Sequence, residues 1–251
     1  MTGLKAMLYR EARLRATNAT FIFWDVVYPL AYLLVFGVGM SSALGGNFAG
    51  MGTGYNAFFL GGVLGMASFG IASNTAWSLF MDRDNGIFYE MLTYPLSRAA
   101  YLIGKVLFNS LIALTQALVT VTLAAWLLHV DVRWSGMPVL AVAVGVGTAG
   151  WFFFYAIFAL MIRRNDAFNT VTSIFYFAFL FASSMFYPIE PLPGAFRMVA
   201  WCNPITWQVD VLRYATIGLG TPSTVVIEAA LFVVFGSACF AGALTALRRQ
   251  D

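Results

Sequence analysis

The sequence predicts an all-α membrane protein with six transmembrane helices in a single domain. Of its 251 residues, 61% are hydrophobic and only 10% are charged, whereas soluble domains carry about 25% charged residues. Six apolar runs each approach or exceed the roughly 20 residues that a helix needs to cross the hydrocarbon core of a bilayer. These runs cover residues 21–40, 57–80, 100–128, 137–162, 167–187 and 225–247.

The distribution of basic residues predicts which way the helices cross the membrane. All of the 14 Lys and Arg residues except Arg133, Arg197 and Arg213 fall on one side of the six spans. Because cytoplasmic loops of membrane proteins carry an excess of Lys and Arg, this side is predicted to be cytoplasmic. Six spans then leave both termini in the cytoplasm, and we expect a multi-pass protein of the plasma (inner) membrane.

Residues 1–20 are predicted to form an amphipathic helix on the inner surface of the membrane. Apolar side chains gather on one side of such a helix, with Lys5, Arg10 and Arg13 off it. Glu11 and Arg15 fall inside the apolar arc, where their spacing of four residues lets them pair. An anionic leaflet favours a basic helix of this kind, so membrane lipid is an expected partner.

The first three spans carry features beyond their length. Pro29 lies within the first span and predicts a kink there. Gly61 and Gly65 give the second span a small-residue face, which allows close contact between helices. Lys105 lies near the cytoplasmic end of the third span, from which its long side chain is expected to snorkel to the membrane surface.

A charged loop at residues 82–98 separates the second and third spans. Asp84 is placed to cap a short helix over residues 85–93. Tyr94 precedes Pro95, and a residue before proline disfavours the helical conformation, so the helix should end there.

This short helix would be amphipathic. Its side chains divide into an apolar arc and a more polar one, namely Ile87, Phe88, Met91 and Leu92 against Tyr89, Glu90 and Thr93. A helix tied to spans at both ends suits docking to a soluble partner. The same pattern also fits a surface loop whose apolar arc rests on lipid or on the protein itself.

Residues 188–222 are predicted to form two short helices on the outer face. Proline residues interrupt the segment and leave helices over 194–201 and 206–219, and Thr206 is placed to cap the second helix. Neither helix is long enough to span a bilayer, so both are predicted to be re-entrant or interfacial. Asp210 and Arg213, three residues apart, can pair there. The segment either gates the pathway or simply covers the ends of the bundle.

Several kinds of active site have little support in the sequence. His129 is the only histidine, and Cys202 and Cys239 are the only cysteines, so a metal site or a Cys/His catalytic centre is hard to assemble. The Gly104-Lys105 pair lacks the other residues of a nucleotide-binding loop. We therefore expect no catalytic residue and no metal or cofactor bound by this chain. Any use of ATP must come from another chain.

Two alternative functions make different demands on the sequence. A secondary transporter or channel working alone should carry ionisable groups near the middle of the membrane. The only carboxylates within apolar runs are Asp25 and Glu228, each near a membrane edge, where an interface anchor or a partner for a nearby arginine is the favoured role. An integral-membrane enzyme would need a cluster of His, Asp or Glu, which a single histidine disfavours.

The order of these parts, over essentially the whole chain, resembles that of the type-2 ABC transporter permeases. Residues 82–98, DRDNGIFYEMLTYPLSR, resemble the loop E-R-E-x-G-T-x-E-x-L-x-x-T-P-x-S-R of the drug-export and nodulation-factor branch more than the polysaccharide exporters. Departures in this loop are Asp82 and Asp84 for glutamates, Ile87 for threonine, and Tyr94 before the proline. The family's N-P-x-x-x-x-x-x-x-x-R stretch resembles Asn203-Pro204 followed, beyond Asp210, by Arg213.

The resemblance implies a half-transporter. Two permease copies, as a homodimer or a heterodimer, would form a pathway along their interface, and two cytoplasmic ABC ATPase subunits would power it with ATP and Mg. The 82–98 loop would be the coupling helix that sits in a cleft of the ATPase. Its expected contact residues are Asp84, Phe88, Glu90, Met91 and Arg98.

The resemblance also implies where substrate would pass. In the family, spans one, two and five build the pathway, which here suggests Asn74, Ser78, Phe175 and Phe179 as lining residues. The outer re-entrant motif would consist of Asn203, Pro204, Asp210 and Arg213. No nucleic acid is expected as a partner.

Overall fold

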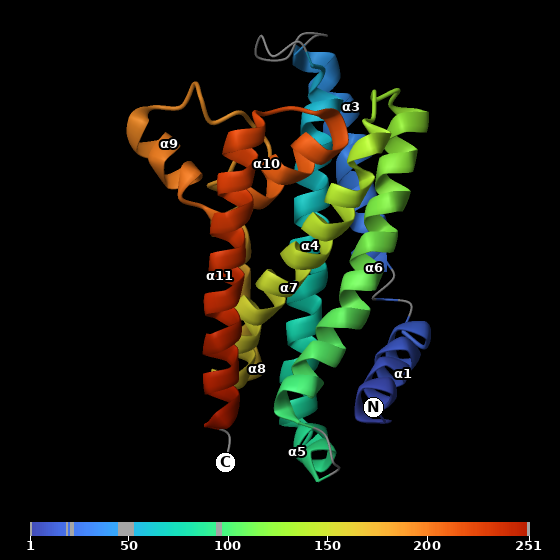
Figure 1. The fold of residues 1–251 in the computed structure, drawn as a ribbon, viewed down its shortest axis with the longest axis vertical. Helices are drawn as coiled ribbons and strands as arrows, with labels where there is room; N and C mark the ends of the chain where they lie inside the picture. Colours follow the sequence, from blue (N-terminus) through green and yellow to red (C-terminus); the bar gives the residue numbers. More distant parts are fainter. Residues whose placement is uncertain (1, 19, 21–22, 45–52, 94–96, 250–251) are drawn as a thin grey trace.

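The computed structural model describes residues 2–18, 20, 23–44, 53–93 and 97–249, and all regular secondary structure among them is helical (Figure 1). The first half contains α1 (Thr2–Ala16), a π-helical turn η1 (Phe23–Val27), α3 (Tyr28–Leu44), α4 (Tyr55–Asp84), α5 (Ile87–Leu92) and α6 (Arg98–Leu127). The second half contains a 3-10 turn η3 (Trp134–Gly136), α7 (Met137–Met161), α8 (Asn165–Phe181), α9 (Gly194–Trp201), α10 (Pro204–Ile217) and α11 (Pro222–Arg248).

Five of these helical stretches, within the described residues, are long and apolar enough to cross a membrane. They are Phe23–Leu44, Tyr55–Asp84, Arg98–Leu127, Trp134–Met161 and Pro222–Arg248. Each overlaps one of the predicted spans. The predicted run 167–187 is represented by α8, which has 17 residues and ends at Phe181. The prediction of an all-helical membrane protein is therefore confirmed, but the count of six spans is not.

The early end of α8 has a physical cause in the packing of α10. Asn203 Nδ2 on the N-terminal side of α10 donates to the carbonyls of Phe179 and Ala182, at 2.8 and 2.7 Å. Arg213 donates to the carbonyls of Ser184 and Met185, at 2.5 and 3.2 Å. Backbone groups that a longer helix would have satisfied internally are thus satisfied by side chains.

Helix α4 forms the centre of the bundle. In its most apolar 18 residues 78% are buried, against 50% or less in the other four candidate spans, and it packs against α3, α6, α7 and α10. The predicted small-residue face is confirmed. A Cβ atom at Gly61 would overlap the Arg213 side chain, and one at Gly65 would lie 2.6 Å from Val209 Cγ2, so α10 can approach α4 only because these positions are glycine.

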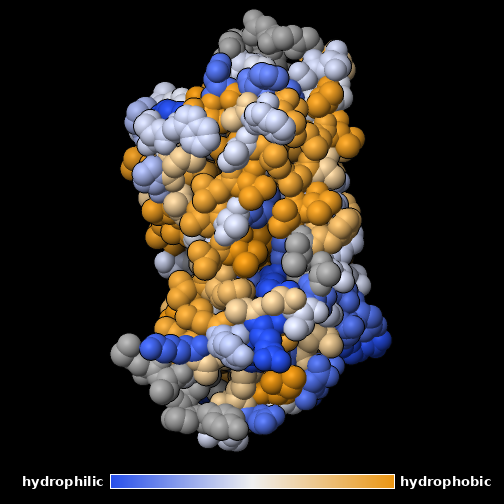
Figure 2. All heavy atoms as spheres, turned by 90° about the vertical axis from the view of Figure 1, so that its right-hand side faces the viewer, coloured by the Kyte–Doolittle hydropathy of each residue, from blue (hydrophilic) through white to orange (hydrophobic). Residues whose placement is uncertain are grey.

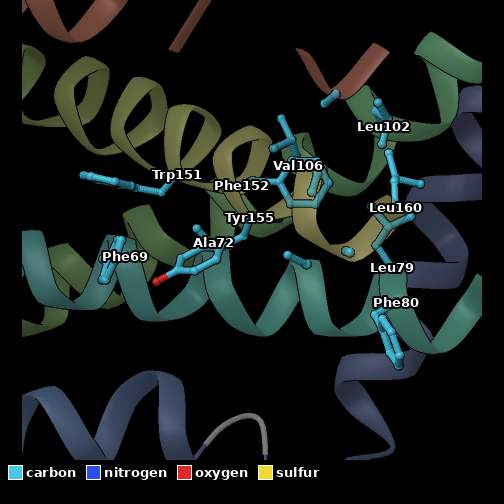
Figure 3. Packing of buried hydrophobic residues seen from close by; sticks show 14 of the residues in the cluster. Phe69, Ala72, Leu79, Phe80, Leu102, Val106, Trp151, Phe152, Tyr155 and Leu160 are labelled. Atoms are coloured by element: carbon cyan, nitrogen blue, oxygen red, sulfur yellow. The ribbon is translucent and has the colours of Figure 1, made fainter. Parts of the chain in front are cut away.

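The largest part of the core lies between α4, α7 and α6 (Figure 3). Phe69 on α4 meets Trp151 on α7 edge to face, with ring centroids 4.5 Å apart. Tyr155 lies one turn further along α7, and its ring centroid is 5.3 Å from that of Phe69. Because each helix is apolar around most of its circumference, such side-chain interlocking sets which faces meet.

The N-terminal and C-terminal helices begin and end, respectively, on the same side of the molecule as α5 (Figure 1), as the predicted topology requires. The N-terminal helix α1, helix α5 and the C-terminus lie toward one end of the molecule, and α9 and α10 lie toward the other (Figure 1). On the face shown in Figure 2, apolar residues cover the upper and middle part, and hydrophilic residues gather toward the lower end, where α1 and α5 lie. Below, the end of the molecule with α1 and α5 is called the α5 end, and the end with α9 and α10 is called the α10 end.

The first candidate span begins irregularly. The π-helical turn Phe23–Val27 precedes α3, and Pro29 is the second residue of α3. Pro29 thus lies in the first turn of α3, where proline is tolerated, and the predicted kink at this residue stays a prediction.

Candidate functional site

The loop between α4 and α6 contains a separate short helix, α5, which lies beyond the end of both long helices. Its start differs from the prediction: α4 continues through Asp84, so this residue closes α4 and does not cap α5. The chain turns at Gly86, which has a φ of +76°, a conformation that glycine adopts without steric cost. The Tyr94-Pro95 pair lies outside the described residues.

The two faces of α5 divide largely as the sequence predicts. Phe88 is fully buried and meets the Tyr101 ring on α6 edge to face, with centroids 5.3 Å apart. Met91 is half-buried against the same core. Tyr89, Glu90 and Thr93 are exposed, as expected, whereas Ile87, assigned to the apolar arc, is 37% exposed. The Leu92 side chain is outside the described part.

The five predicted ATPase contacts therefore differ in accessibility. Asp84 and Glu90 are exposed, Met91 and Arg98 are half-buried, and Phe88 is buried in the single chain. Phe88 can act on a partner only through α5, because its ring is already enclosed. The contact role of all five residues stays a prediction.

Beneath α5 lies a cluster of buried charges that joins α1, α4 and α6. The Asp82 carboxylate on α4 accepts hydrogen bonds from Nη2 and Nη1 of Arg10, at 2.5 and 3.1 Å, and from the Tyr101 hydroxyl, at 2.8 Å. Lys105 Nζ lies 3.0 Å from Asp82 Oδ2 and 3.0 Å from Glu11 Oε1. Buried ions are tolerated only when paired and hydrogen-bonded, and each member of this cluster has at least one opposite charge in contact.

The prediction that Lys105 snorkels to the membrane surface is wrong. Its side chain is 0% exposed. Two carboxylates, Asp82 and Glu11, reach it from neighbouring helices, so its charge is compensated inside the protein and need not extend to water. Glu11, which looked misplaced on the apolar side of an interfacial helix, faces the bundle for the same reason.

A second ion pair holds the start of the first span. Asp25 in the π-helical turn is buried and pairs with Arg15, which also bonds to Asn109 on α6. Asn74 Nδ2 on α4 donates to the other Asp25 oxygen at 2.9 Å. Burial lowers the pKa of the Arg15 guanidinium to about 10, with the Glu11 carboxylate opposing the shift. Asp25 is thus the partner of a nearby arginine, as the sequence favoured.

The four predicted pathway residues lie in two separate places. Asn74 bonds to Asp25, and Ser78 Oγ accepts a hydrogen bond from Lys105 Nζ at 3.0 Å, so both belong to the polar network under α1. Phe175 and Phe179 on α8 pack around Phe154 of α7, with ring centroids 5.3 and 5.5 Å from it. Whether either pair lines a pathway stays a prediction.

At the other end of the molecule, the motif Asn203-Pro204 starts α10. Asn203 Oδ1 accepts a hydrogen bond from the Ile205 amide at 3.1 Å, and Pro204 is the first helical residue. The predicted cap at Thr206 is wrong, because the helix begins two residues earlier. Thr206 Oγ1 donates instead to the Ala200 carbonyl at 2.6 Å. An asparagine cap followed by proline is a favourable start for a helix.

The predicted pair of Asp210 and Arg213 is confirmed. Arg213 Nη1 lies 2.7 Å from Asp210 Oδ1, and Nε donates to the Phe58 carbonyl at 3.0 Å. The guanidinium carbon lies 3.6 Å from the centroid of the Phe58 ring. Burial raises the pKa of Asp210, and Arg213 and Ser184 oppose the shift. Arg213 therefore joins α10, α4 and the segment after α8.

Sequence reasoning missed the cluster under α5, although a signal for it existed. Glu11 and Arg15 stand inside the apolar arc of residues 1–20, and Lys105 stands inside an apolar span. These charges stand at positions where the pattern calls for apolar side chains, and they lie on segments that can be adjacent. Charged groups of opposite sign in such positions are expected to pair with one another and not to face lipid.

Comparison with known proteins identifies relatives of the chain. The family model of the ABC-2 type transporter matches residues 2–217. The chain is 24% identical over 190 residues to the "Putative transport permease ycf38" of Porphyra purpurea. It is 22% identical over 198 residues to the protein of the same name from Cyanophora paradoxa. Each match covers 75% of this chain and 65% of the relative's length.

Replacement of Lys105 by methionine should destabilise the protein by roughly 3–5 kcal/mol, because it leaves buried carboxylates without their shared cation. Unfolding of the purified protein in mixed micelles, followed by circular dichroism, measures the change. Arg164→Met is the control, since Arg164 and Asp166 form an exposed pair with side chains 79% and 68% exposed. If the two variants unfold alike, the cluster does not stabilise the fold.

Replacement of Arg213 by lysine should destabilise the α10 end by about 2 kcal/mol or more, since a lysine keeps the charge but cannot reach all the carbonyls that the guanidinium serves. The unfolding midpoint under the same conditions reports the effect. Arg197→Lys, at an exposed position on α9, should leave the midpoint unchanged. A midpoint for Arg213→Lys equal to that of the unmodified protein would show that the carbonyl contacts are dispensable.

Proposed function

This chain belongs to the ABC-2 type transporter family, and from that premise we propose that it is the permease subunit of an ATP-driven exporter. The activity is transport; hydrolysis of ATP with Mg would belong to a separate cytoplasmic ABC ATPase. The observation that carries the proposal is the position of α5. Helix α5 stands at the same end of the bundle as α1 (Figure 1), with Tyr89 and Glu90 exposed, while the buried Phe88 packs it against the bundle.

The contacts of α5 connect it to both long helices, as a lever requires. Phe88 packs on Tyr101 of α6, and the Tyr101 hydroxyl bonds to Asp82 of α4. A partner that pushes α5 would therefore act on both long helices at once, and through Arg10 on α1. Coupling of this kind needs rigid elements that move together, and buried charges and rings supply the rigidity.

The proposal includes a second permease copy beside α8. One face of α8 exposes Asn169, Thr170 and Ser173 together with Ile174 and Phe177. Polar side chains on a membrane helix rarely face lipid; they face protein or a watery path. We take α8 as the sixth span, which together with α3 and α4 would border a pathway between two copies. A homodimer and a heterodimer both fit this arrangement.

Glu90→Arg should uncouple ATP hydrolysis from transport, because it reverses an exposed charge on the helix that would meet the ATPase. The measurement compares ATPase activity and substrate export by the complex in the same vesicles. Asp131→Arg reverses an exposed charge at the α10 end and should change neither. Normal export by a fully assembled Glu90→Arg complex would refute the coupling role of α5.

The proposed orientation places the α5 end in the cytoplasm of a cell with this protein in its plasma membrane. Cys202, next to α9, is an exposed free thiol, and Cys239 is buried. A membrane-impermeant maleimide should therefore label Cys202 from outside intact cells. In a Cys202→Ser background, Thr93→Cys should be labelled only after the cells are permeabilised. The reverse pattern would invert the topology.

A further inference from the structure

A cavity at the α10 end has features that the transport proposal does not use. Its volume is about 660 Å³, and its walls come from α4, the segment after α8, and helices α9, α10 and α11. That volume lies within the range of about 300–1,000 Å³ that is common for small-molecule sites. Apolar side chains, among them Ile189, Met198, Trp201 and Val225, form much of the wall.

The cavity contains one buried carboxyl group without a hydrogen-bond partner in the described part of the chain. Glu228 on α11 lines the cavity and is 4% exposed, and its Oε2 atom makes no hydrogen bond to any described residue. At 1.5 Å per residue it lies roughly 9 Å along α11 from Pro222. A buried carboxyl oxygen without a hydrogen bond is costly whether the group is charged or neutral, so its position calls for an explanation.

The other charged groups of the cavity differ from Glu228. Asp210 and Arg213 form an ion pair at 2.7 Å. Glu190 and Arg197 are both exposed, where water screens them. Glu228 is therefore the buried carboxyl group of the wall that has no counter-charge in contact among the described residues, and it stands where attraction to a cation would be strong.

These features favour an organic cation over a metal ion. A hard metal ion takes about six or more oxygen ligands, whereas Glu228 is the one buried carboxyl group of the cavity that is not in an ion pair among the described residues. A cation with an apolar body needs only one counter-charge and an apolar wall, and an aromatic residue such as Trp201 adds attraction for positive charge.

We propose that this cavity binds a lipophilic organic cation, with the Glu228 carboxylate as counter-ion and the apolar wall around the carbon body. The cation could come from the ammonium head of a membrane lipid or from a free amphipathic molecule. The site belongs to the permease chain alone, so it does not depend on the proposed ATPase coupling.

Equilibrium dialysis of the purified chain in uncharged dodecyl maltoside micelles tests the proposal. The probe is tetraphenylphosphonium, and tetraphenylborate is a control of the same shape and opposite charge. We expect saturable binding of tetraphenylphosphonium alone. Glu228→Gln should weaken it about tenfold or more, because a buried charge contact is lost. Equal binding of both probes, or unchanged binding by Glu228→Gln, would overturn the proposal.

Two further variants keep the test decisive. Asp131→Asn removes an exposed carboxylate outside this cavity and should change binding by less than about twofold, since an exposed charge is screened. If Glu228→Gln does not fold, Thr224→Phe keeps the carboxylate but fills space in the cavity wall, and it should abolish binding. Unchanged binding by Thr224→Phe would likewise refute the site.

Lipid competition distinguishes the two sources of the cation. Phosphatidylethanolamine added to the micelles should displace tetraphenylphosphonium if a lipid ammonium group is the natural occupant, whereas phosphatidylglycerol should not. If neither lipid competes while binding still requires Glu228, the occupant is a free organic cation. Both results support the site and differ only in its ligand.

Discussion

The pairing of Asp82 with Arg10, Tyr101 and Lys105 is the interaction on which the α5 end depends. It places a guanidinium from α1 and an ammonium and a phenol from α6 within hydrogen-bond reach of one carboxylate on α4. Such a cluster is costly to desolvate, and its groups are all paired only when the three helices pack in this arrangement. Helix α1 is thereby part of the bundle, although its composition is that of a surface helix.

At the α10 end, Arg213 is a buried cation that holds several segments together in a similar way. Arg213 crosses from α10 to α4 and to the backbone after α8, and Gly61 leaves the space that its side chain occupies. In both places a buried cation is held by oxygens from several segments. Between the two ends, packing is mostly apolar and aromatic, as around Phe69 and Trp151. Interlocking side chains set which faces meet in this middle part, and the charged clusters at the two ends add bonds that only one arrangement of the helices satisfies.

A force on α5 would pass through Phe88 and Tyr101 into the rigid cluster and along α4, the most buried helix, to Gly61 and Arg213 at the other end. The cavity that contains Glu228 lies beside this second cluster. The same helix thus links the candidate ATPase contact to the candidate cation site.

The sequence by itself determined the helical class, the approximate position of the membrane spans, the grouping of the termini with the 82–98 loop, and the Asp210–Arg213 pair. These follow from local patterns: apolar length, basic residues at span ends, and a spacing of three along a helix. Only the tertiary structure decided where Lys105, Glu11 and Arg15 face, why α8 stops at Phe181, and that Asn203 rather than Thr206 caps α10. Except for the local cap at Asn203, the deciding partners include groups remote in sequence: Lys105 meets Glu11 94 residues away, and Arg213 meets Ser184 29 residues away. Periodicity reports the face on which a residue lies, but it does not report which buried group from another helix stands opposite.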